Sequence, residues 1–307
     1  MTLVLLALGS AVVYGTADFF GGAASRRAPA RSVLLISLPV GLVTLVAGAL
    51  ATGDAFTGQG LAWGLAAGLA GGTGLIVFYG ALARGPMSVV APVAALISAL
   101  LPVAVGLAQG ERLSLSALIG VLICLVAVCL VSMEGDAVQP RSVRGPIMAA
   151  ISGAGFGIFF VLLREAGRHG GLWTLAAARA SGLAAVLAIA LIGWALMRWT
   201  APRHHRRDLA LGVDTRRKIT PTSVRGAALD APVLVIAVAA GILDSLANLL
   251  YLLATRAGML SLAAVLTSLY PAITVLLARL VYSERLRLVQ RLGIVLALTG
   301  VALVTAG

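Results

Sequence analysis

Long apolar stretches alternate with short polar, glycine- or proline-containing connections along most of the chain. A transmembrane helix needs roughly 17 to 25 predominantly apolar residues to cross the hydrocarbon core of a bilayer. The pattern predicts ten transmembrane helices, at residues 2–24, 32–51, 60–83, 86–108, 115–133, 146–164, 172–197, 232–254, 259–280 and 289–306. The one long polar connection, residues 198–230, is expected to lie outside the membrane.

Composition agrees with this pattern. Of 307 residues, 60% are hydrophobic and 11% are charged, whereas soluble domains contain about 45–50% apolar and about 25% charged residues. The net charge of +12 does not indicate nucleic-acid binding, because the basic residues lie mainly in connections, where membrane proteins carry them for orientation. The first apolar segment lacks the basic start of a secretory signal, since no Lys or Arg precedes Arg26, and is read as a permanent helix.

The two halves of the chain resemble each other. Three motifs recur in order: Tyr79-x4-Arg84-x2-Met87 as Tyr251-x4-Arg256-x2-Met259, Glu111-Arg112-Leu113 as Glu284-Arg285-Leu286, and Ser10…Tyr14-Gly15 as Ser152…Phe156-Gly157. Each half contains five predicted helices, and an odd number forces the second half to enter the membrane in the opposite sense. The sequence therefore predicts an all-α membrane protein of ten transmembrane helices in two inverted five-helix repeats, at residues 1–135 and 145–307.

Several motifs resemble a known family. They are Tyr14-Gly15-Thr16-Ala17-Asp18-Phe19 in the first helix, Gly85-Pro86-Met87-Ser88 at the start of the fourth, and the two Glu-Arg-Leu turns. On these residues the chain resembles the EamA-type ten-helix transporters of the drug/metabolite transporter superfamily. The resemblance implies a multi-pass protein of the plasma or inner membrane. It also implies proton-coupled or facilitated movement of small metabolites or toxic compounds, often by export.

Two alternatives to transport are compatible with a polytopic membrane protein. A non-transporting scaffold or receptor-like subunit stays open, although carboxylates within the spans and an inverted repeat favour transport. A passive channel would need a continuous polar stripe along several helices, which the sequence does not show. The expected partners are the lipid bilayer and a small-molecule substrate, with no nucleic acid, and a homodimer is left open.

Ionisable residues within the predicted spans are the first candidates for function, because charge at bilayer depth is costly. Asp18 lies in the first helix, Arg179 in the seventh and Asp244 in the eighth, with Asn248 one turn from Asp244 on the same face. In one interpretation Asp18 or Asp244 is a protonatable coupling group. In the other, Asp244 forms a structural pair with Arg179.

Prolines point to the fourth and ninth helices as the wall of a cavity, because a proline frees backbone carbonyls. The prolines are Pro92, Pro102 and Pro271. The expected polar lining consists of Ser98, Ser268 and Tyr270, and Asp18 is expected to face the same cavity together with Tyr14. Two further residues near helix ends, Tyr79 and Tyr251, are interpreted as interfacial anchors.

No motif for an enzyme or a pump is present. Lys218 is the only lysine, and it has neither the preceding Gly nor the following Ser or Thr of a nucleotide-binding P-loop. None of the three histidines lies in an apolar span, so no metal site, cofactor or catalytic residue is predicted. Arg164 and Glu165 are expected to form an interfacial ion pair.

Orientation receives two conflicting indications. Eighteen of the 23 Lys and Arg residues lie in odd-numbered connections, and cytoplasmic connections are enriched in such residues. The charge rule therefore places both termini outside the cytoplasm, whereas transporters that the chain resembles generally keep both termini inside it. The prediction follows the charge rule.

Overall fold

The structure is a computed structural model. It describes residues 1–28, 30–82, 84, 87–132, 143–200, 230–282 and 287–306. Within these residues all regular structure is helical, and ten spans are long and apolar enough to cross a membrane. The predicted ten-helix membrane architecture is confirmed.

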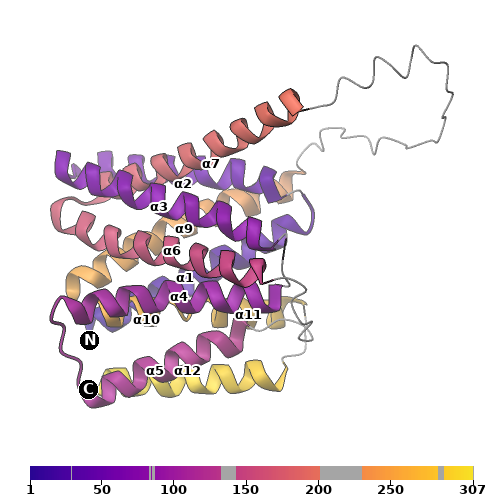
Figure 1. Cartoon of the computed structure of the whole chain (residues 1–307). Coiled ribbons are helices and arrows are strands. Elements are labelled where there is room, and N and C mark those ends of the chain that lie inside the picture. The colour runs from indigo at the N-terminus through magenta and orange to yellow at the C-terminus, as the bar shows by residue number, and fades with distance from the viewer. Residues whose placement is uncertain are drawn as a thin grey trace, which may run out of the picture.

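The first repeat provides five continuous helices (Figure 1): α1 (Thr2–Ser25), α2 (Ala30–Thr52), α3 (Gly58–Leu82), α4 (Met87–Ala108) and α5 (Leu115–Ser132). The second repeat provides α6 (Arg144–His169), α7 (Leu172–Thr200), α9 (Ala231–Ala257), α10 (Leu260–Thr267), α11 (Tyr270–Tyr282) and α12 (Leu288–Ala306). The helices α10 and α11 together form the ninth span, which is broken in its middle.

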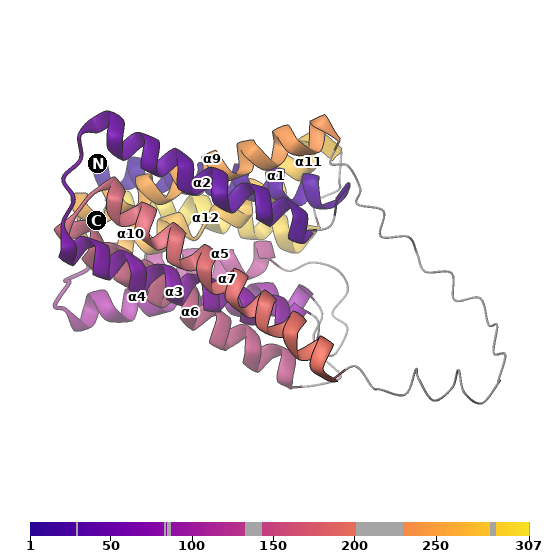
Figure 2. The same cartoon turned by 90° about the horizontal axis from the view of Figure 1, so that it is seen from above.

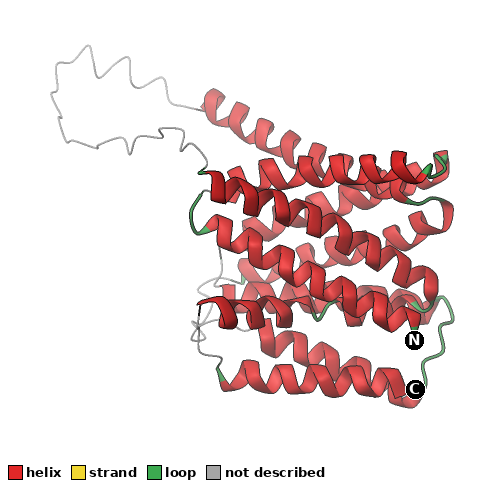
Figure 3. Cartoon of the chain, turned by 180° about the vertical axis from the view of Figure 1, so that it is seen from behind, coloured by secondary structure: helices red, strands yellow, loops and turns green. Residues whose placement is uncertain are grey.

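Ten crossings return the chain to the side from which it started. Figure 1 and Figure 2 show both termini at one end of the bundle, which we call the termini side. We call the opposite end the loop side. Seen from behind, the bundle shows short connections between helices beside the termini (Figure 3). Of the expected turns and loops, residues 201–229 and Ser283–Leu286 lie outside the described residues.

Inverted repeats are visible in matched hydrogen bonds. The Ser10 hydroxyl of α1 donates to the Ala247 carbonyl of α9 at 2.8 Å. The Ser152 hydroxyl of α6 donates to the Gly74 carbonyl of α3, also at 2.8 Å. Ser152 is the counterpart of Ser10, and Ala247 directly follows Leu246, the residue 172 positions after Gly74, so closely similar bonds join the two helix pairs. The helix pairs α1–α9 and α3–α6 are thus equivalent interfaces.

Glycine packing repeats in the same way. A β-carbon on Gly15 would lie 2.6 Å from both the Tyr270 carbonyl oxygen and the Ile273 side chain. A β-carbon on Gly157 would lie 3.3 Å from the Ser98 carbonyl oxygen and 2.8 Å from Leu101. Because 270 and 273 each follow 98 and 101 by 172 positions, α1 packs on the ninth span as α6 packs on α4.

The two repeats differ most in the proline-containing spans, α4 in the first repeat and the ninth span in the second. Pro92 and Pro102 both lie inside α4, which remains one continuous helix. The ninth span instead ends one helix at Thr267 and starts the next at Tyr270. Pro271 is the second residue of α11, a position that needs no intrahelical amide donor. The prolines therefore coincide with an interruption of the α-helix in only one of the two equivalent spans, and there the Ser268 and Leu269 amides still donate to the Ala264 and Leu266 carbonyls, at 2.9 and 3.3 Å.

Candidate functional site

Burial changes abruptly at the break in the ninth span. All eight residues of α10 are buried. None of the 13 residues of α11 is buried. Since α10 begins on the termini side and α11 ends on the loop side, the ninth span is enclosed by other helices at the termini side and partly exposed at the loop side, where α11 still packs closely on Gly15 of α1 (Figure 1).

Burial along one face of α1 also decreases from the termini side to the loop side. Ala7, Ala11, Tyr14 and Asp18 share one helical face, because they are spaced three or four residues apart. Ala7 and Ala11 are buried, Tyr14 is partly buried and Asp18 is exposed. The surface that is sealed near the termini is therefore open at Asp18. Figure 2 shows α7 diverging from α9 and α11 toward the loop side.

A charged pair joins α7 to α9 in the bundle. The Arg179 guanidinium forms an ion pair with the Asp244 carboxylate, and the two side chains are 16% and 33% exposed. The Asn248 side-chain amide donates to the Asp244 carbonyl at 2.8 Å. The structure therefore places Arg179, Asp244 and Asn248 together, as the structural-pair interpretation of the sequence requires.

Asn248 leaves one acceptor unused. Its side-chain oxygen is buried and has no hydrogen-bond partner among the described residues. A buried polar atom without a partner costs about 1–3 kcal/mol, so such atoms in native structures call for an explanation. Here the oxygen belongs to Asn248, whose amide group donates to Asp244 of the charged pair.

The sequence did not indicate how α2 makes room for this pair. A β-carbon on Gly41 of α2 would lie 2.7 Å from the Ser245 hydroxyl and 3.4 Å from the Arg179 side chain. The Ser245 hydroxyl donates to the Gly41 carbonyl at 3.0 Å. A larger residue at position 41 would first displace the Ser245 hydroxyl of α9, so Gly41 permits the close approach of α2 and α9 beside Arg179.

Two tyrosines connect Asp18 to the charged pair. The rings of Tyr14 and Tyr270 lie with centroids 6.0 Å apart. Tyr14 is within electrostatic reach of both Asp18 and Arg179. Asp18 itself has no ion-pair or hydrogen-bond partner among the residues that the structure describes. We call Tyr14, Asp18, Arg179, Asp244, Asn248 and Tyr270 the central cluster.

The two predicted serines are not joined to the central cluster by hydrogen bonds. The Ser98 hydroxyl donates to Ala95 of its own helix at 2.9 Å. The Ser268 hydroxyl donates to Val265 at 2.7 Å, within the last turn of α10. Both serines are buried. Their role as cavity lining stays a prediction.

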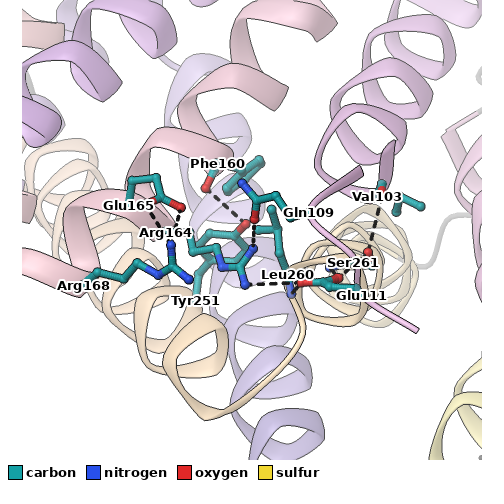
Figure 4. A network of polar contacts seen from close by, with 10 residues as sticks. All are labelled: Val103, Gln109, Glu111, Phe160, Arg164, Glu165, Arg168, Tyr251, Leu260 and Ser261. Atoms are coloured by element: carbon teal, nitrogen blue, oxygen red, sulfur yellow. Dashed lines mark hydrogen bonds and ion pairs between the residues drawn. The ribbon is translucent and has the colours of Figure 1, made fainter. Parts of the chain in front are cut away.

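A second polar network, which sequence reasoning missed, closes the termini side (Figure 4). Glu111, in the connection between α4 and α5, accepts from the Leu260 amide at 2.6 Å and from the Ser261 amide at 3.0 Å. It also accepts from the Ser261 hydroxyl at 2.6 Å. A carboxylate satisfies the free amides of a helix N-terminus and opposes the positive end of its dipole. Glu111 thus caps α10.

Arg164 links this cap to α6. It lies 3.4 Å from the Glu111 carboxylate and donates to the Gln109 side chain at 2.7 Å. The expected local pair of Arg164 with Glu165 is wrong, because Glu165 pairs with Arg168 at 3.1 Å instead. Neighbours in a helix point in different directions, whereas residues three apart share a face.

Tyr251 completes the closure. It is fully buried, with its ring centroid 4.7 Å from that of Phe160. Its expected role as an interfacial anchor is therefore wrong. The side chain of its counterpart Tyr79 lies outside the description. The available signal was the Glu-Arg-Leu turn, which marked Glu111 but not its partners about 150 residues away.

The sequence model of the EamA-like transporter family matches residues 1–133 and 143–306, which together are nearly the whole chain. The chain belongs to the EamA-like transporter family. Members of the EamA family are transporters rather than enzymes, so this chain is a multi-pass membrane transporter by family.

Comparison of folds agrees with this assignment. One crystal structure of another protein superposes on 99% of the chain and 96% of its own, with a TM-score of 0.73 and 18% sequence identity. At that identity the likeness extends to the fold alone. No curated protein matches the sequence.

Proposed function

We propose that this EamA-family protein is a secondary transporter that exports small metabolites or toxic compounds across the plasma or inner membrane. The observation that carries the proposal is the contrast within the ninth span, which is fully buried in α10 and without buried residues in α11. A carrier exposes its site to one side at a time, and a bundle tight at one end and loose at the other has the form of one such state.

The central cluster is the proposed binding and coupling site. Arg179 and Asp244 compensate each other's charge. Within the membrane, Asp244 therefore does not need to gain a proton and Arg179 does not need to lose one. Asp18 is exposed and has no partner among the described residues. We therefore assign proton coupling to Asp18, and substrate contacts to Tyr14, Tyr270 and the Asn248 region.

Opening of the termini side requires a definite set of bonds to break. The three hydrogen bonds from α10 to Glu111 and the ion pair of Glu111 with Arg164 hold α10 against the α4–α5 connection and α6. In the opposite-facing state these contacts must separate while the loop side closes around α11. The break at Ser268–Leu269 lets α10 and α11 move separately.

Flux measurement tests the proposal. Purified protein in proteoliposomes is given a mixture of radiolabelled amino acids, nucleobases and small organic acids, with and without a pH gradient. We expect protein-dependent flux of at least one compound, accelerated by the gradient, and its loss in Asp18→Asn. Arg291→Gln serves as control, because Arg291 is an exposed residue of α12, a helix that contributes no residue to the central cluster. Absence of flux for every compound favours the scaffold alternative.

Orientation is tested separately. A fluorescent reporter active only in the cytoplasm is fused after Gly307, a residue outside the described range. The distribution of arginines predicts a dark fusion. Bright fluorescence would place the termini side in the cytoplasm and overturn the interpretation of the charges.

A further inference from the structure

Two pockets meet at the connection between α9 and α10, on the termini side. The first has a volume of about 280 Å³ and is lined by Arg164, Arg168, Thr255, Arg256 and Gly258. The second has a volume of about 330 Å³, and its lining includes Leu3, Val4, Gly258, Met259, Leu262 and Val304. The first pocket contains three arginines, whereas the second is mostly apolar with Thr305 at its lining, and Gly258 borders both.

The arginines of the basic pocket have N–H donors that form no hydrogen bond within the described residues. Arg168 directs one terminal nitrogen to both Glu165 oxygens, and its other nitrogens have no acceptor among the described residues. Arg256 donates from Nε to Gly167 at 2.7 Å and from one terminal nitrogen to Gly170, leaving Nη1 without an acceptor in the same part of the chain. A guanidinium carries five N–H donors, so both side chains can bind an anion without giving up their present bonds.

The charges around the pocket favour an anion. Three guanidinium groups face two nearby carboxylates, Glu111 and Glu165. The C-terminus of α6 also ends here, and a helix C-terminus repels anions. However, Arg256 already covers two carbonyls at that end.

We propose that an anionic phospholipid binds across Gly258, with its phosphate on Arg168 and Arg256 and an acyl chain in the apolar pocket. The site lies at the ends of transmembrane helices, the level at which headgroups meet the hydrocarbon core. Phosphate is a ligand that arginine binds in a forked geometry, and the adjoining, mostly apolar pocket favours an occupant that also has an apolar part. Gly258 has no side chain to separate headgroup from chain. The proposal is independent of the transported substrate.

The test measures binding to the full-length protein in neutral detergent, by thermal stability and native mass spectrometry. The ligands are phosphatidylglycerol, phosphatidylcholine with identical chains, and inorganic phosphate. We expect phosphatidylglycerol to raise the melting temperature more than phosphatidylcholine does, and phosphate alone to have no effect. An equal effect of the two lipids, or a full effect of phosphate alone, overturns the proposal.

Variants locate the site. Arg168→Gln should weaken phosphatidylglycerol binding about tenfold, which corresponds to loss of one charge-assisted hydrogen bond. Glu165→Gln should strengthen binding, because it removes a carboxylate that competes for Arg168. Val4→Trp should weaken it by filling the apolar pocket, and Arg291→Gln should leave it unchanged. Unchanged binding in both Arg168→Gln and Val4→Trp would show that the lipid does not bind here. Neither readout requires transport, so failure here leaves the proposed transport function unaffected.

Discussion

The helices α10 and α11 belong to one span, and α11 follows α10 after only two residues, yet their surroundings are opposite. Every residue of α10 is buried, and its N-terminus is capped by a carboxylate from the other repeat. No residue of α11 is buried. Both segments are apolar, so hydrophobicity does not distinguish them. What distinguishes them is the kind of polar contact: the carboxylate of Glu111, itself paired with Arg164, holds α10, whereas α11 is joined to α1 by the hydroxyl of Thr274, which donates to the Gly15 carbonyl at 3.1 Å.

The first prediction removes that fixation. Glu111→Gln should destabilise the protein by about 3 kcal/mol, because Glu111 is only 8% exposed and its loss leaves Arg164 buried without its charge partner. Amide hydrogen exchange should accelerate in α10 while that in α11 stays the same. Glu165→Gln is the matched control, since its partner Arg168 is 56% exposed and exposed pairs contribute about 0–1 kcal/mol. Equal effects of the two variants would disprove the closing role of Glu111.

The second prediction concerns the pair between α7 and α9. Asp244→Asn should cost about 2 kcal/mol, less than Glu111→Gln, because the Asp244 side chain is 33% exposed and water screens the charge left on Arg179. Adding Arg179→Gln should restore much of the stability but not transport. Chemical denaturation of the single and double variants measures this coupling. If the double variant is as unstable as the single one, the pair is not structural.

The third prediction compares the two repeats. Gly15→Ala brings a methyl group within 2.6 Å of a backbone oxygen of the broken span, whereas Gly157→Ala approaches the equivalent oxygen of continuous α4 at 3.3 Å. Overpacking of this kind costs about 1–3 kcal/mol. We expect Gly15→Ala to lower the melting temperature more than Gly157→Ala does. The reverse order would mean that α1 is free to move away from the ninth span.

The smallest perturbation maps the open side without changing stability much. With the native Cys124 and Cys129 replaced by alanine, we expect Asp18→Cys and Ala278→Cys to react with a water-soluble maleimide. Ala263→Cys, in the fully buried α10, should not react. Substrate should protect position 18. Labelling of position 263 at the rate of position 278 would contradict the closed termini side.

The sequence was sufficient for the ten spans, since length and hydropathy alone determine them, and for the pairing of repeats through recurring polar motifs. The break in the ninth span was not predictable in that way. Apolar residues continue through it, and α4 contains two prolines without an interruption, neither of them at Ala99, the residue 172 positions before Pro271. The sequence also brought Asp244, Arg179 and Asn248 to attention because ionisable residues are rare within spans.

The polar network around Glu111 on the termini side was not predictable from the sequence for a different reason. Glu111 and Ser261 are 150 residues apart, and although the Glu-Arg-Leu turn marks Glu111, nothing in the sequence marks Ser261 as its partner. Only the packing of α10 against the α4–α5 connection brings them together. The sequence predicts an ion pair of Arg164 with the adjacent Glu165, because no local feature indicates that its partner is Glu111 in another part of the bundle.

The broken span has a continuous counterpart within the same molecule. By the offset of 172 that relates Gly15 and Gly157 packing, Ser268–Leu269 corresponds to Leu96–Ile97 in the middle of α4. The two equivalent spans thus differ in backbone conformation within one molecule: α4 is continuous, and the ninth span is interrupted between α10 and α11. Each span shows a conformation that the other could adopt. When the molecule faces the other side, we expect the shapes to be exchanged, with α4 parting at Leu96–Ile97 and the ninth span becoming continuous. Spin labels placed on either side of both positions would report this exchange as opposite changes in distance.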